Sequence, residues 1–481
     1  MSIVRKLATD TAAYGVSSIL ARLINFLFGF LIIKYITQAE FGTFTNFYAY
    51  AGFLLVALTH GMETAYFRFS NKEESKEMAF STSFYSILSV VITFVLLGYI
   101  FQDAIADYVK EPALYVRFFL WMMAFDALSA IPFAALRKQG RPIAFAALKI
   151  ANILFFIGCN ILFFMVFPML DIALPFTKVS NIFIANILAS ILTFLLLLKQ
   201  FRQLKLQFSK TLYKQMLVYA MPIMLVGFAG MINEVLDRII MTRLLPFDDI
   251  TNKEQLGIYG FNYKFAMLVS MFLQAYRFAA EPLFFKHADK SDNKQMLALT
   301  MKYYTICVCL IFLSIVLFMP LIQAVFILYS PNSAAYFEGA GIIPVLLMAN
   351  IFLGIYFNIS TWYKITDKTY IGALISVLGA IVTIVMNVLL VPEYGYWGAA
   401  WATFTCYFIM VLVGYATEQR YYPIPYDYKR ISGYLLGATG LFLFLHYVIL
   451  PLSWSLWANT FAGFLLLSLF AGAAWQLERK K

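Results

Sequence analysis

The segment from Tyr370 to Val391 reads YIGALISVLGAIVTIVMNVLLV and contains no Asp, Glu, Lys or Arg. A helix of about 20 apolar residues is long enough to cross the hydrocarbon core of a bilayer. A membrane barrel strand is shorter, with about 10 residues, and alternates in polarity. The segment therefore predicts a transmembrane helix, and much of the remaining chain is built in the same way.

Composition places the whole chain in the membrane class. Of its 481 residues, 62% are hydrophobic and 13% are charged, whereas a soluble domain has about 45–50% apolar and about 25% charged residues. These values exclude an ordinary cytosolic enzyme, a disordered protein and a disulfide scaffold. We predict an all-α polytopic membrane protein with about 14 transmembrane helices, at residues 11–36, 44–67, 80–101, 114–136, 143–168, 179–198, 214–244, 258–285, 296–326, 340–363, 370–391, 397–417, 432–451 and 457–475.

The sequence carries no signature of catalysis or of a cofactor. The four cysteines lie in apolar stretches without zinc-ligand spacing, and the three histidines are scattered. No Gly-Lys-Ser/Thr loop could hold a nucleotide phosphate. We expect no enzyme activity, no metal and no cofactor.

The placement of Lys and Arg predicts the orientation of the helices. The net charge is +11, and short cytoplasmic loops are enriched in Lys and Arg. If Arg5 and Lys6 are cytoplasmic, nearly all loop cations fall on the same side, and the opposite side receives Lys110, Lys178 and Lys253. This bias predicts an inner-membrane protein with both termini in the cytoplasm. The basicity is then a topology signal, and no nucleic acid partner is expected.

A weak internal repeat divides the predicted helices. The segment Phe41–Ala51 aligns with Leu256–Ala266 at a constant offset, and the fifth and eleventh spans align as well. Two halves of even helix number have the same topology, and transporters of this kind bind substrate between their halves. We predict a bundle in residues 1–208, a second in 209–418, and two additional helices in 419–481.

Two arginines are predicted to lie deep in the membrane. Arg22 is near the middle of the first span, and Tyr14, Ser18 and Asn25 share its helix face. Arg277 is eight residues from the cytoplasmic end of the eighth span. A charged side chain at the bilayer centre costs about 2.5 kcal/mol or more, so each arginine is a candidate for binding substrate in a cavity. The alternative is a structural bond to main-chain carbonyl groups.

The seventh span carries Asn233, Glu234, Asp237 and Arg238. Glu234 and Arg238 are four residues apart and can pair on one helix face. Asp237 then needs another partner, with Arg243 as one option. Asn233 is assigned to substrate binding, and the charged trio either is a structural ion pair or couples transport to protons or cations.

Glu63 and Arg68 end the second span on the cytoplasmic side. A gate, a local ion pair and plain interfacial solvation are all compatible with this position.

The segment Asn387–Thr403, NVLLVPEYGYWGAAWAT, resembles the junction of the eleventh and twelfth helices in Wzx-type polysaccharide flippases. This family belongs to the multidrug/oligosaccharidyl-lipid/polysaccharide exporter superfamily. Pro392 would end one helix and the following glycines would shape a tight turn. Other similar segments are Tyr14-Gly15 with Arg22, Leu136-Arg137 with Arg141, Ile232-Asn233 with Leu236-Asp237-Arg238, and Gly257-Ile258-Tyr259.

The resemblance implies two six-helix bundles in a V-shaped arrangement around a central cavity, plus two C-terminal helices. It implies transport of undecaprenyl-pyrophosphate-linked oligosaccharide from the cytoplasmic to the periplasmic leaflet, for O-antigen or exopolysaccharide export. Arg22 and Arg277 fall on the helices that carry cavity arginines in the related lipid II flippases. Implied partners are the lipid-linked substrate, membrane lipids, a polysaccharide polymerase and glycosyltransferases.

Two other function classes remain open at the sequence level. A multidrug cation exporter of the same fold should carry carboxylates in its first-half cavity, where this chain has Arg22. A membrane glycosyltransferase or polymerase usually needs a sizeable extramembrane loop. The net positive charge within the spans favours an anionic headgroup over a cationic drug.

Overall fold

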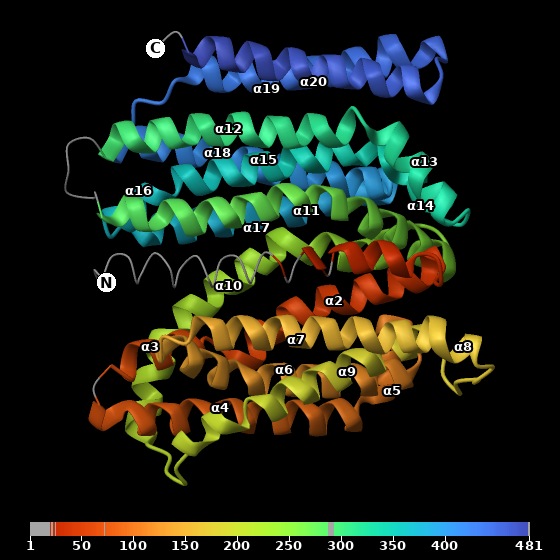
Figure 1. The fold of residues 1–481 in the computed structure, drawn as a ribbon. Helices are drawn as coiled ribbons and strands as arrows, with labels where there is room; N and C mark the ends of the chain where they lie inside the picture. The colour runs from red at the N-terminus through yellow and green to blue at the C-terminus, as the bar shows by residue number, and fades with distance from the viewer. Residues whose placement is uncertain (1–19, 21–22, 25, 72, 287–292, 480–481) are drawn as a thin grey trace. The chain divides into compact units, whose positions relative to one another are not determined.

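Helices account for all regular structure in the part of the chain that the computed structural model describes (Figure 1). That part excludes residues 1–19, 21–22, 25, 72, 287–292 and 480–481, and also the side chains of 73–76, 279, 281–283 and 285–286. The chain forms two compact units. Unit 1 is Met1–Thr242 with Phe247–Glu254, and unit 2 is Arg243–Pro246 with Gln255–Lys481. The predicted all-α class is confirmed.

Unit 1 contains long helices joined by short turns and one-turn helices. Its elements are α2 (Gln38–Thr59), α3 (Met62–Phe69), α4 (Glu73–Ile100), α5 (Gln102–Val109), α6 (Ala113–Lys138), α7 (Pro142–Ile161), the π-helix η1 (Leu162–Val166), α8 (Phe167–Met169), α9 (Lys178–Leu196), the 3-10 helix η2 (Leu198–Gln203) and most of α10 (Lys210–Leu244).

Unit 2 comprises Arg243–Pro246 and, from Gln255 onward, the rest of the long helix α11 (Asp249–Lys286), whose first turns belong to unit 1. Its further elements are α12 (Asn293–Val316), α13 (Met319–Tyr329), α14 (Ser333–Tyr336), η3 (Phe337–Ile342), α15 (Ile343–Ile359), α16 (Thr361–Ile365), α17 (Thr369–Tyr394), α18 (Tyr396–Tyr421), α19 (Tyr428–Phe444), η4 (Leu445–Ile449), η5 (Leu450–Leu452) and α20 (Leu456–Arg479).

Thirteen helices of the described residues are long and apolar enough to cross a membrane. Each corresponds to one of the predicted spans after the first, of which residues 11–19, 21–22 and 25 lie outside the described residues. Large apolar side chains remain exposed along these helices, among them Trp457, Phe461 and Leu469 on α20. Apolar surface of this extent would promote aggregation in water, whereas the acyl chains of a lipid bilayer solvate it. The polytopic helical fold is therefore confirmed.

The core of unit 1 is centred on α6, the helix with the largest buried share among the candidate spans. Met123 and Ala127 of α6 pack in one apolar cluster with Phe47 of α2, Phe80 of α4 and Phe183 of α9. The rings of Phe47 and Phe183 meet edge to face, with centroids 5.1 Å apart. This packing holds four helices of unit 1 together.

The second predicted span, 44–67, is interrupted rather than continuous. His60 and Gly61 adopt left-handed conformations with φ of 33° and 71°, so α2 ends and α3 starts at a new angle. A Cβ atom on Gly61 would lie 2.9 Å from the main-chain oxygen of Ala220 on α10. The close approach of α10 and the positive φ both require glycine here.

The predicted span 296–326 is also two helices. Helix α12 ends at Val316, and α13 starts at Met319 with Pro320 in its first turn. Proline has no N–H to donate to the preceding turn, so a helix starts at this residue more easily than it continues through it.

The junction of α17 and α18 explains the glycines in the segment Asn387–Thr403. Gly395 has φ 56° and ψ −134°, a conformation that side chains disfavour. A Cβ atom on Gly398 would lie 2.3 Å from the main-chain oxygen of Leu390. The two helices therefore pack with direct backbone contact at this turn.

The C-terminal helices α19 and α20 are joined to α12 by a largely buried polar cluster. Lys302 of α12 is 4% exposed and forms an ion pair with Glu478 of α20. Arg430 and Tyr434 of α19 both donate to the Glu478 carboxylate at 2.8 Å. The last two helices are thus an integral part of unit 2. The predicted division at residues 208/209 and 418/419 stays a prediction about transport bundles, since the compact units exchange chain between Thr242 and Gln255.

Candidate substrate-binding and coupling residues

Arg277 lies on α11 in unit 2 and is partly buried. Its guanidinium carbon is 4.3 Å from the centre of the Phe357 ring on α15. The adjacent Tyr276 donates its hydroxyl hydrogen to Asn358 Oδ1 at 2.5 Å. An aromatic face attracts a guanidinium within about 6 Å, and the planar guanidinium is the cationic group best suited to binding phosphate. The structure thus holds the predicted cation against an aromatic wall.

The other predicted substrate-binding residues of the first span, Tyr14, Ser18, Arg22 and Asn25, lie outside the described residues. Their role stays a prediction.

The charged group on α10 is arranged differently from the predicted pairing. Arg238 donates to the main-chain oxygen of Glu234 at 2.6 Å, and its guanidinium lies 3.5 Å from Asp237 Oδ1. The Glu234 side chain is exposed, whereas Asp237 is only 3% exposed. The expected Glu234–Arg238 ion pair is therefore replaced by an Asp237–Arg238 pair, because the guanidinium turns toward the buried carboxylate. Asn233, one turn earlier, is buried on the same helix.

Glu63 and Arg68 have separate partners in unit 1. Glu63 forms an ion pair with Arg137 at the end of α6. Arg68 stacks on Tyr219 of α10, with its guanidinium carbon 4.2 Å from the ring centre. Arg137 also lies 5.1 Å from the Phe67 ring. Both predicted gate residues thus connect the short helix α3 to neighbouring helices, and a gating role stays a prediction.

Residues 7–288 match the family described as polysaccharide biosynthesis protein. The match covers more than half of the chain and includes the segments around Arg22, Asp237 and Gly257. The chain belongs to the polysaccharide biosynthesis protein family. The family resemblance inferred from sequence is confirmed.

Solved structures show the same fold across most of the chain. The inward closed conformation of the lipid II flippase MurJ superposes with a TM-score of 0.76 at 15% identity, covering 96% of this chain and 98% of that chain. An inward-facing multidrug resistance MATE family transporter of the MOP superfamily has a TM-score of 0.67 at 14% identity, covering 88% and 98%. The MATE multidrug transporter DinF-BH has a TM-score of 0.63 at 15% identity, covering 88% and 97%. No curated protein sequence matches the chain. This member of the polysaccharide biosynthesis family therefore has the fold of membrane flippases and exporters.

Unit 1 also contains a polar cluster that was not predicted as a site from the sequence. Ser190 of α9 donates to Asp126 Oδ1 of α6 at 2.6 Å. One turn away, Asn186 bonds to the hydroxyl of Tyr48 on α2. The signal in the sequence was Asp126, because a carboxylate within an apolar span by itself marks a functional candidate. The spacing of Asn186 and Ser190 on one face of the sixth span could have indicated its partners.

A second group missed from sequence connects α5, α2 and the start of α11 within unit 1. Lys253 lies 2.9 Å from Glu111, and Thr43 donates to Glu111 at 2.6 Å. Lys110 forms an ion pair with Asp249. Asp248 caps α11 by accepting from the main-chain N–H groups of Ile250 at 3.1 Å and Thr251 at 3.3 Å. It also accepts from the hydroxyl of Thr251 at 2.6 Å, and this hydrogen bond holds the pKa of Asp248 below its usual value. Two of the three cations predicted for the outer side thus have carboxylate partners.

Proposed function

We propose that the protein moves an undecaprenyl-pyrophosphate-linked oligosaccharide from the cytoplasmic to the periplasmic leaflet of the bacterial inner membrane. The family match over residues 7–288 carries this proposal. Both termini are then cytoplasmic, and bundles 1–208 and 209–418 alternate in access while 419–481 adds two helices. The process needs no covalent chemistry, so the protein acts as a transporter rather than an enzyme.

Charge within the membrane-spanning part supports an anionic headgroup as cargo. A pyrophosphate is strongly anionic, and its interaction with a cation strengthens as the local dielectric constant falls. Arg277 supplies such a cation on a transmembrane helix, where the ring of Phe357 limits its motion. A cationic drug would be repelled by the same guanidinium. We assign Arg277, with Arg22 of the first span, to the pyrophosphate, and Tyr14, Ser18, Asn25 and Asn233 to other substrate contacts.

The buried Asp237–Arg238 pair is our candidate for coupling. A buried carboxylate whose partner is a permanently charged guanidinium changes its environment if the helix rotates or a cation enters. Glu234 is the exposed member of the same group. Sodium or a proton acting on Asp237 would connect an ion gradient to the movement of α10.

Translocation of a fluorescent lipid-linked oligosaccharide in proteoliposomes tests the cargo. We expect Arg277→Ala to abolish translocation and Arg277→Lys to retain part of it, since lysine keeps the charge but not the planar donors. Arg420→Ala is the matched control, because Arg420 is exposed at the end of α18 and stacks on Tyr421. Full translocation by the Arg277→Ala protein would refute the assigned role. Transport of a cationic dye in place of the glycolipid would support the multidrug alternative.

A second measurement tests coupling and location. Asp237→Asn should remove the dependence of translocation on a sodium or proton gradient, whereas unchanged dependence would exclude Asp237. Reporter fusions at both ends of the chain should place both termini in the cytoplasm. Co-purification with a polymerase or glycosyltransferases would identify the proposed partners.

A further inference from the structure

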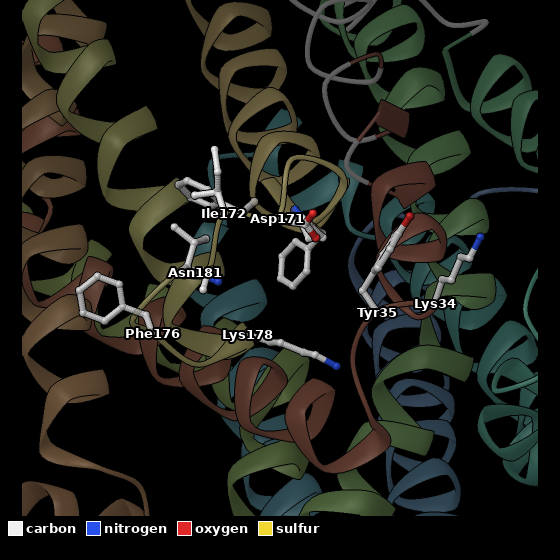
Figure 2. A pocket seen from close by; sticks show the side chains of 12 residues that line it. Lys34, Tyr35, Asp171, Ile172, Phe176, Lys178 and Asn181 are labelled. Atoms are coloured by element: carbon white, nitrogen blue, oxygen red, sulfur yellow. The ribbon is translucent and has the colours of Figure 1, made fainter. Parts of the chain in front are cut away.

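A cavity of about 720 Å³ opens within unit 1, between the end of the first span, the end of the α7–α8 segment and the start of α9. Its volume is within the range of about 300–1,000 Å³ that is typical of small-molecule sites. Figure 2 shows Lys34 and Tyr35 on one wall, with Asp171, Phe176, Lys178 and Asn181 around the rest. None of these residues is among those assigned above to transport.

Helix α9 aims two of these residues into the cavity. Thr177 caps the helix by accepting from the main-chain N–H of Ser180 at 3.2 Å, and its own position is fixed by a 2.7 Å hydrogen bond with Tyr115. Lys178 is then the first residue of the helix and Asn181 the fourth, so both share one face. The unpaired N–H groups of the first turn add a partial positive charge at the same place.

Asn181 is the observation that points to a ligand. It is only 7% exposed, and it lines the cavity. In the described part of the chain, no hydrogen bond is made by its side-chain amide. Buried amide groups are normally hydrogen-bonded, so an amide directed into a cavity suits a polar group that enters it.

The opposite end of the cavity is shaped by two backbone irregularities. The π-turn η1 follows α7, and π-turns widen a helix and are frequent at functional sites. After α8, Asp171 has a φ of 53°, which closes the turn and brings its carboxylate to the rim. Phe164 of η1 packs on Tyr35 with ring centres 5.8 Å apart, forming an aromatic wall.

The chemistry of the lining defines the ligand class. Two ammonium groups and a helix N-terminus suit a phosphoryl group. A carboxylate, an amide and aromatic faces suit the hydroxyl groups and apolar faces of a sugar or a polyol. Both lysines are at the helix ends that the charge bias assigns to the outer side, where cations are scarce in this sequence.

We infer that this cavity binds a phosphoryl headgroup that carries hydroxyl groups, presented from the outer leaflet. The cavity lies on the side of the membrane where the cargo would leave the transporter. This inference rests on the proposed function, under which the cavity receives the headgroup of the lipid-linked sugar after translocation. A phospholipid headgroup such as phosphatidylglycerol has the same chemistry and is the second source.

Equilibrium binding to the purified full-length protein tests the site without any transport. The probes are geranyl-pyrophosphoryl-N-acetylglucosamine, dihexanoyl phosphatidylglycerol and free N-acetylglucosamine oligosaccharide. All proteins carry Arg22→Ala and Arg277→Ala, which remove the two phosphate contacts assigned above. We expect Lys34→Gln with Lys178→Gln to weaken binding of the phosphate-bearing probes at least tenfold, about 1.4 kcal/mol.

Two variants keep both lysines and test the cavity itself. Asn181→Leu removes the inward amide, and Ala173→Trp places a large side chain at a lining residue. Both should weaken binding by a similar factor. Arg117→Gln is the matched control, since Arg117 is another exposed cation near the predicted outer end of α6 and bonds Gln102 at 2.6 Å.

The probes separate the two sources and the two proposals. Tighter binding of the pyrophosphoryl sugar supports an exit site for cargo. Equal or tighter binding of phosphatidylglycerol supports a lipid headgroup site of the same chemistry. Affinities that are unchanged in the lysine, Asn181 and Ala173 variants would overturn the inference. Failure of the proposed function would appear separately, as absence of translocation by the wild-type protein.

Discussion

Glu478 on α20 is expected to determine whether the last two helices stay attached to unit 2. Its carboxylate pairs with Lys302, which is 4% exposed, and accepts from Arg430 and Tyr434 at 2.8 Å. Glu478→Gln keeps the shape of the side chain and one acceptor oxygen but removes the charge. Removing one partner of a buried pair typically costs about 3–5 kcal/mol, because the other charge stays buried without compensation. Arg430 loses less stabilisation than Lys302, because Asp427 lies 3.2 Å from its guanidinium and remains as a partner.

The resulting loss can be measured as a melting temperature. For a unit of this size, 1 kcal/mol corresponds to about 2–4 °C, so a loss of about 3–5 kcal/mol predicts a decrease of about 6–20 °C. The assay is thermal unfolding of the purified protein in detergent, and the folded fraction is measured by size-exclusion chromatography or with a thiol-reactive dye.

Two further proteins make this measurement decisive. Arg479→Gln changes a neighbouring charge whose side chain stacks on Trp475 at 5.0 Å, and it should melt as the wild type does. Lys302→Met combined with Glu478→Gln removes the uncompensated charge and should recover most of the loss. A Glu478→Gln protein that melts within experimental error of the wild type would show that the cluster does not stabilise unit 2.

Three other changes have expected outcomes. Gly398→Ala should lower the free energy of unfolding by about 1–3 kcal/mol and reduce the yield of folded protein, because the added Cβ atom would lie 2.3 Å from a main-chain oxygen. The control is Gly440→Ala, whose Cβ atom would meet nothing within 4 Å, and it should leave the melting temperature equal or higher. Glu111→Gln should lower the melting temperature, because the Glu111 side chain that pairs with Lys253 is only 4% exposed. Lys110→Gln breaks the pair with Asp249, whose side chains are 44% and 51% exposed, and should change the melting temperature little. Equal effects of the two substitutions would contradict the role of burial. The lowered pKa of Asp248 means that its capping bonds stabilise the fold above pH about 4 and are lost as the pH falls through the folded-state pKa; Asp248→Ala should therefore destabilise at pH about 7 and converge with the wild type on acidification.

The number and type of the helices could be predicted from sequence because the signal is local. Each span needs only a run of apolar residues about 20 long. The interruptions could not be predicted in the same way. Gly61 is a break because the backbone of Ala220 lies against it, and that neighbour is distant in sequence.

For the candidate residues, the sequence indicated residue types but not the partners of each side chain. Arg277 stands out in sequence because charge is rare within a span, yet its contact with Phe357 depends on how α11 packs on α15. On α10, helix spacing favoured Glu234 as the partner of Arg238, whereas burial selected Asp237. Spacing defines which residues can meet, and packing decides which of them do. For the same reason, the convergence of Lys34 and Lys178 on one cavity required the structure.

The exchange of chain between the two units affects how the gene could be divided. Residues Arg243–Pro246 belong to unit 2, and the next eight, Phe247–Glu254, return to unit 1 before the chain leaves it again. Neither unit is therefore encoded by one continuous stretch, and a cut after Thr242 would leave Glu111 on one polypeptide and Lys253 on the other. Two fragments made separately would have to find each other to complete unit 1.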